Sequence, residues 1–151
     1  MISDETKKQA ALAIFLRVYG VLSIIIFTSL IVGFAVQTPL LAEGGPLNWL
    51  IWNGIHCGGE PCHVPPMLFI IYLVWAVFFF LAARNPLAYV SFLSFTMWAY
   101  LAHGLLMTVQ ALTHLADQWH RFFGDIPYEL IMALGIYLWR PAARQDVPQT
   151  R

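Results

Sequence analysis

Charged side chains are scarce in this sequence. Asp, Glu, Lys and Arg make up 11% of its 151 residues, whereas hydrophobic residues make up 60%; average soluble domains are about a quarter charged. The eight acidic and eight basic residues cancel to a formal net charge of zero, so the chain lacks the positive field that non-specific nucleic-acid binding requires. The composition therefore predicts a membrane protein that contacts lipid and binds no nucleic acid.

Familiar catalytic motifs are also missing from the sequence. It contains no phosphate-binding glycine loop, no dinucleotide fingerprint and no Ser-His-Asp arrangement. A missing motif is weak evidence against catalysis. We therefore leave enzymatic activity open, favour a non-catalytic role, and can name no cofactor.

Long uncharged runs indicate the fold. Residues 18–36, 64–83 and 86–116 contain no Asp, Glu, Lys or Arg, and each is long enough to flag a spanning helix. A fourth run, Ile126–Trp139, would be only about 21 Å long as a helix, against a hydrocarbon core of about 30 Å, so it must extend past Pro141, thin the bilayer or stop short. We predict an all-α polytopic membrane protein: a single domain, 1–151, with four transmembrane helices in an up-down bundle and a disordered C-terminal tail. The predicted helices cover about 12–37, 64–84, 86–118 and 126–142.

The basic residues predict the orientation, because cytoplasmic flanks carry an excess of Lys and Arg. With four spans, Arg121 is the only basic residue on one side of the membrane. The other side receives Lys7, Lys8, Arg17, Arg84, Arg140, Arg144 and Arg151. Both termini are therefore expected in the cytoplasm, and the expected location is a bacterial inner membrane.

A polar stripe runs along the third predicted helix. Two series with a spacing of seven residues fall on one helical face. They consist of Thr96, His103, Gln110 and Asp117, and of Tyr100, Met107 and His114. Such a stripe is costly against lipid, so we expect it to face the bundle interior or a water-filled cavity. It would either join helices through polar contacts or form a proton path or ligand cavity open to the outside.

His103 is the histidine expected to lie deepest in the membrane. We predict a neutral imidazole bonded to Tyr100 or to a facing hydroxyl such as Thr28 or Ser29. Bis-histidine haem ligation needs two histidines on facing helices. The other predicted helices contain no histidine, so this kind of haem site within one chain is disfavoured.

The first outer loop reads His56-Cys57-Gly58-Gly59-Glu60-Pro61-Cys62-His63. Two cysteines on the oxidising side of a membrane, separated by a turn, favour a Cys57–Cys62 disulfide. Two thiolates and two imidazoles could instead form a tetrahedral zinc site. A redox-active cysteine pair is a third alternative, although thiol oxidases of the four-helix type use Cys-x-x-Cys spacing.

Acidic residues lie at the start of the fourth predicted helix. Gly124-Asp125-Ile126-Pro127 is typical of an N-cap followed by proline in the first turn. The negative charges of Asp125 and Glu129 would both interact favourably with the positive end of the helix dipole. The alternative is a metal site, because carboxylates and imidazoles are suitable ligands. Its ligands would be His114, Asp117, His120 and Glu129.

Several of these segments resemble a known group of proteins. The similarity covers about residues 64–141 and rests on Ala83-Arg84-Asn85-Pro86, on the series Trp98, His103, Met107 and Gln110, and on His120 followed by Gly124-Asp125-Ile126-Pro127. These segments resemble small bacterial four-helix membrane proteins of unknown function, the BphX-like group, which are encoded near aromatic-degradation genes. The resemblance implies fold and membrane location, and it points to His103, Gln110, His120 and Asp125 as residues to test.

Size and motif content together favour one function. We expect a small accessory or assembly subunit of a larger membrane complex, or a chain that associates with itself. Helix contacts would use a lipid-facing aromatic surface at Trp75, Phe78, Phe79 and Phe80. The alternatives are a membrane metal- or redox-site protein that uses outer His, Cys and Asp groups, and a small transporter.

Overall fold

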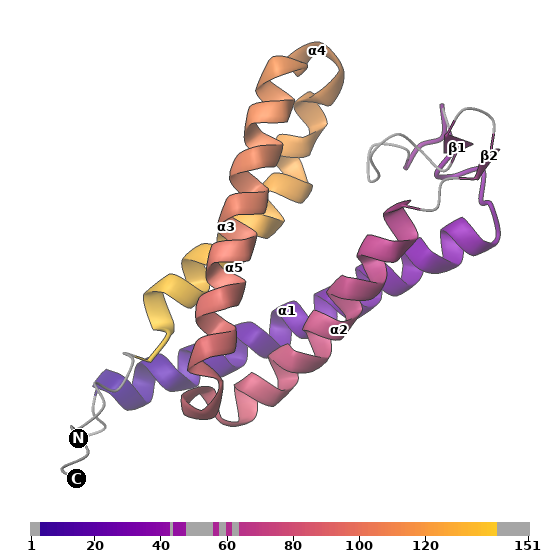
Figure 1. The fold of residues 1–151 in the computed structure, drawn as a ribbon. Coiled ribbons are helices and arrows are strands. Elements are labelled where there is room, and N and C mark those ends of the chain that lie inside the picture. The colour runs from indigo at the N-terminus through magenta and orange to yellow at the C-terminus, as the bar shows by residue number, and fades with distance from the viewer. Residues whose placement is uncertain (1–3, 43, 48–55, 58–59, 62–63, 142–151) are drawn as a thin grey trace, which may run out of the picture.

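Four long helices dominate the computed structural model, which describes residues 4–42, 44–47, 56–57, 60–61 and 64–141 (Figure 1). They are α1 (Asp4–Ala35), α2 (Val64–Arg84), α3 (Val90–Thr113) and α5 (Asp125–Trp139). Between them lie the 3₁₀ helices η2 (Pro86–Tyr89) and η3 (Trp119–Phe123) and the single-turn α4 (Leu115–Gln118). Two-residue strands β1 (His56–Cys57) and β2 (Glu60–Pro61) pair antiparallel, with Cys57 opposite Glu60.

Three helical segments are long and apolar enough to cross a membrane: Asp4–Ala35, Val64–Arg84 and Pro86–Thr113. The all-α class expected from the uncharged runs is therefore confirmed, and these three helices fit the expected membrane protein. The fourth helix, α5, has 15 residues and a length of about 22 Å. η3 precedes it in the chain and is separated from it by Gly124, which is not helical (φ −128°, ψ −92°).

The first helix begins and ends differently from its predicted range, 12–37. It begins at Asp4, because Asp4 and Glu5 occupy its first turn, where the helix dipole favours acidic side chains. It ends at Ala35, after which Gln37 takes a positive φ of 51°. The Gln37 and Thr38 N–H groups donate to the carbonyl oxygens of Phe34 and Gly33, which is the Schellman pattern.

The predicted helix 86–118 is wrong as a continuous element. Its first four residues form η2, and α3 ends at Thr113 because His114 leaves the helical region (φ −126°, ψ 42°). The Thr113 hydroxyl donates to the Gln110 carbonyl oxygen at 2.9 Å, a local bond of the kind that bends helices. Consequently the seven-residue stripe does not continue along one helix to Asp117.

The fourth helix stops short of Pro141, three residues before its approximate predicted end at residue 142. α5 ends at Trp139, and Arg140 is extended (φ −61°, ψ 143°). The residue before a proline is pushed out of the helical region by the proline ring. The tail predicted to be disordered, residues 142–151, lies outside the described part of the chain.

The long helices form two antiparallel pairs, α1 with α2 and α3 with α5 (Figure 1). Asp4, Arg84 and Trp139 lie at one end of the molecule, which we call the base; β1, β2 and α4 lie at the opposite, open end. The two pairs cross and diverge toward the open end instead of forming a closed bundle.

The core explains this shape. One hydrophobic cluster draws on all four long helices, whereas a second, formed around Met107, Ala111 and Ile126, draws only on α3, α5 and η3. Between the pairs, Gly135 of α5 packs against the Phe15 ring of α1, which leaves no room for a Cβ at this position. The expected lipid-facing aromatic surface is partly wrong, because Phe79 is fully buried and packs near Tyr100.

Candidate functional site

Polar side chains from α2, α3 and α5 meet where the two helix pairs begin to diverge. The Tyr72 hydroxyl donates to Glu129 Oε1 at 2.8 Å and lies 3.0 Å from His103 Nδ1. Glu129 Oε2 lies 4.0 Å from the same imidazole nitrogen. We call Tyr72, His103 and Glu129 the polar cluster. Because the three residues come from three helices, the cluster links the two pairs.

A second group of hydrogen bonds holds α1 against α5 beside this cluster. The Ser23 and Tyr128 hydroxyls are 2.6 Å apart, and the Tyr19 hydroxyl donates to the Tyr128 carbonyl oxygen at 3.3 Å. Ser23 also donates to the Tyr19 carbonyl oxygen at 2.7 Å within α1. Tyr128 directly precedes Glu129, so these bonds fix the helical turn that carries the carboxylate.

Aromatic rings form the walls of the polar cluster. The Tyr72 ring stacks on Phe27 of α1 with centroids 4.4 Å apart, and it meets the Tyr100 ring of α3 nearly edge-on at 6.0 Å. On the next turn of α2, the Trp75 indole N–H donates to the buried Thr96 hydroxyl at 3.0 Å. The walls restrict the Tyr72 ring, and with it the position of its hydroxyl.

Burial differs sharply across the polar cluster. The Glu129 side chain is 6% exposed, whereas the His103 side chain is 42% exposed. Glu129 Oε2 accepts no hydrogen bond within the described residues. The arrangement thus offers a buried carboxylate behind a half-exposed imidazole, and it can hold a proton or bind a polar group that approaches His103.

A charged pair closes the turn at the open end of the α3–α5 pair. Arg121 of η3 is buried, its Nη1 donates to Asp125 Oδ2 at 2.7 Å, and its Nε donates to Gln118. Burial lowers the pKa of the Arg121 guanidinium, and the adjacent Asp125 opposes that shift. Asp125 is the first residue of α5 and makes no side-chain cap, so it pairs with Arg121 instead of acting as the expected N-cap.

The structure brings together His103 and Glu129 among the predicted site residues. His103 bonds to Tyr72 of α2 and not to Tyr100, Thr28 or Ser29; the last two are exposed on α1. Glu129 lies inside the helix junction, not at the helix start.

The remaining predicted residues lie elsewhere. Gln110 is half-buried on α3, His114 is exposed at the helix break, and the half-buried His120 lies beside the Trp119 ring. Across the described residues no three His, Cys, Asp or Glu side chains gather as a metal site. The Asp117 side chain, the Cys57 side chain and Cys62 lie outside the described part, so the disulfide stays a prediction.

Three contributors were missed from the sequence: Tyr72, Ser23 and Tyr128. A signal for Tyr72 was present, because its hydroxyl is the only one in the run 64–83. A lone hydroxyl in an apolar span needs a partner, and the stripe on α3 offered one. Ser23 had no comparable signal, since α1 also contains Thr28 and Ser29.

The fold and the polar cluster define a small helical membrane protein with ionisable side chains inside its helix junction. Over residues 9–150 the sequence matches the model of a family of unknown function, DUF6632, and the chain belongs to that family. Neither the curated proteins nor the solved structures include a significant match to it. The family match does not name the BphX-like group.

Proposed function

We propose that this protein is an accessory or assembly subunit of a larger membrane complex, and that a partner covers His103 where the helix pairs diverge. One observation carries the proposal: His103 lies ten residues from the end of α3, about 15 Å along the helix, and yet is 42% exposed. An ionisable side chain at that depth is costly against lipid and usually faces protein or water. A polar group on a partner helix would bond His103 and cover it.

The surroundings support a protein partner. α3 also exposes Leu106 and Val109 near the same level, which provides apolar area for helix packing. Interhelical hydrogen bonds from His are a recognised means of joining membrane helices. Self-association would satisfy the same requirements, with His103 of a second copy as the partner group.

The experiment is co-purification from native membranes in mild detergent, with the complex sized by native mass spectrometry. We expect a stoichiometric complex that His103→Leu dissociates. Leu105→Phe is the matched control, because Leu105 lies two residues along α3, on roughly the opposite face, and is 53% exposed. A wild-type protein that remains monomeric, or a complex that survives His103→Leu, contradicts the proposal.

A small transporter is the second candidate, favoured by the same pair of ionisable groups. Carboxylate and imidazole chains inside membranes commonly mark proton pathways. Proton flux into vesicles that contain the purified protein tests this function. Flux that Glu129→Gln abolishes would favour transport over the accessory role.

The alternative of a metal- or redox-site protein depends on the outer His and Cys residues. We propose a Cys57–Cys62 disulfide in that loop, because both residues lie on the side expected to be oxidising. Mass spectrometry of protein alkylated without reductant should find both thiols blocked. Free alkylation of both thiols would contradict the disulfide and revive the metal alternative, which metal analysis then tests.

We further propose four crossings with both termini in the cytoplasm, in a bacterial inner membrane, with α5 as the fourth crossing. The base carries Lys7, Lys8, Arg84 and Arg140, whereas Arg121 is the basic residue at the open end. The positive-inside rule assigns such a base to the cytoplasm. A reporter fused after Arg151 should give a cytoplasmic signal, and an outside signal would reverse the orientation.

A further inference from the structure

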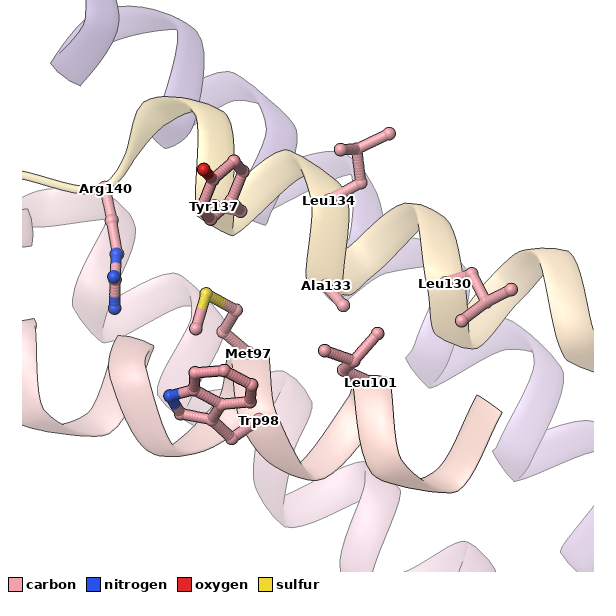
Figure 2. Close-up of a pocket in the computed structure, with 8 residues that line it drawn as sticks. All are labelled: Met97, Trp98, Leu101, Leu130, Ala133, Leu134, Tyr137 and Arg140. Atoms are coloured by element: carbon pink, nitrogen blue, oxygen red, sulfur yellow. The ribbon is translucent and has the colours of Figure 1, made fainter. Parts of the chain in front are cut away.

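A groove of about 410 Å³ lies between α3 and α5, on a different face of α3 from the polar cluster (Figure 2). Its walls are apolar along most of their length: Met97, Trp98 and Leu101 from α3, and Leu130, Ala133 and Leu134 from α5. Trp98 is 62% exposed and Leu134 is 54% exposed, so the groove is open along its side. In a membrane-spanning pair of helices, that side faces lipid.

Polar atoms gather at one end of the groove. Figure 2 shows the Arg140 guanidinium there, with the Trp98 indole nitrogen turned toward the same end. Arg140 Nη1 donates to the Ser94 hydroxyl of α3 at 3.1 Å, which holds the guanidinium across the space between the helices. The opposite end, at Leu130, is apolar.

The polar end lies at a membrane interface. Arg140 follows the last residue of α5 at the base, and arginine near a helix end extends its charge to the interface. Tryptophan and tyrosine also favour this level. The groove therefore offers an apolar channel for a hydrocarbon chain and, at headgroup depth, a fixed positive charge with the Trp98 indole N–H as a further hydrogen-bond donor.

We propose that the groove binds one anionic phospholipid, with an acyl chain along α3 and α5 and the headgroup phosphate at Arg140. Basic pockets between spanning helices recognise lipid headgroups in this way. A zwitterionic lipid carries its own cation beside the phosphate, so the Arg140 charge favours an anionic lipid over a zwitterionic one. The site does not involve His103, so the accessory role and the lipid site can each fail alone.

Native mass spectrometry with phosphatidylglycerol and phosphatidylcholine tests the headgroup contact on the full chain. Wild type should bind phosphatidylglycerol about fivefold more tightly, and Arg140→Gln should remove that preference. Arg140→Lys should retain most of it, because it keeps the charge. Arg84→Gln is the matched control, since Arg84 is exposed at the end of α2, away from the groove. An unchanged preference in Arg140→Gln, or an equal loss in Arg84→Gln, overturns the site.

A second pair of variants tests the acyl channel without touching the charge. Leu134→Trp should fill the groove and lower the binding of both lipids, whereas Leu138→Trp, on an exposed part of α5 outside the groove, should not. Equal binding by wild type and Leu134→Trp would overturn the acyl contact. These variants also keep the proposal testable if Arg140→Gln loses stability through its bond to Ser94.

Discussion

The base and the open end of this molecule are built in different ways. At the base the two helix pairs press together through apolar contacts: Phe15 of α1 packs against Gly135 and lies 5.3 Å, ring to ring, from Trp139. Toward the open end the pairs share polar contacts at Tyr72, His103 and Glu129 and then diverge. The α3–α5 pair keeps a small hydrophobic cluster of its own beyond that point.

The difference suggests that the base holds the helix pairs together, whereas the polar cluster is available for binding. In lipid, helices gain little from apolar contact unless side chains interdigitate closely, which the glycine at the base permits. Such packing fixes the crossing of the pairs. The polar cluster above it has one exposed member and one carboxylate oxygen without a hydrogen bond among the described residues, so it retains the capacity to bind.

Gly135→Leu should lower the stability of the protein more than any other change, because it disrupts the apolar packing of the two helix pairs at the base. A Cβ at Gly135 would clash with the Phe15 ring, so the ring or the helices that carry the two residues must shift. We expect a loss of about 3 kcal/mol, the upper range for overpacked cores. Thermal unfolding in detergent measures it, with Leu138→Ala on the exposed side of the same helix as the control. Wild-type stability would mean that the base does not fix the crossing.

Tyr72→Phe should cause the second-largest loss of stability, because it removes the hydroxyl that joins the two helix pairs at the polar cluster. The buried carboxylate of Glu129 would lose its 2.8 Å donor, at a cost of about 2 kcal/mol. The control is Tyr137→Phe, since Tyr137 is 64% exposed and should change stability by less than about 0.5 kcal/mol. If both variants unfold at the same temperature, the cluster does not stabilise the junction.

Thr96→Val should cost about 1 kcal/mol, because it removes the acceptor of the Trp75 indole while keeping the side-chain shape. Thr108→Val is the control: the Thr108 hydroxyl bonds only to Gly104 within its own helix. The denaturant midpoint of each variant measures the difference. Equal midpoints would show that the contact between α2 and α3 adds no stability at this level.

His103→Leu should have the smallest effect on stability, within about 0.5 kcal/mol, because the Tyr72 hydroxyl keeps Glu129 as its acceptor and no buried group is stranded. The expected change is loss of the partner complex at an unchanged unfolding temperature. A loss of stability above about 1 kcal/mol would instead assign His103 to the support of the fold.

The sequence determined the class of the protein and most of its helices. Uncharged apolar runs of spanning length can only be helical in lipid, where every backbone group must be bonded internally, and the predicted range 64–84 matches α2. Helix ends were less predictable, because they depend on local bonds: Gln37 adopts a left-handed conformation, Thr113 bonds back to Gln110, and Pro141 excludes Arg140 from α5.

The candidate site was only partly predictable for a related reason. A stripe on one helix identified His103 as a residue that needs a partner, and the chemistry of Glu129 was visible in the sequence. The remaining part of the site depends on the register between the helices. Only the crossing of the two pairs places Tyr72 of α2 between the imidazole on α3 and the carboxylate on α5. Helical periodicity specifies which face a residue occupies, but the level at which two faces meet depends on close packing at contacts such as Phe15 with Gly135.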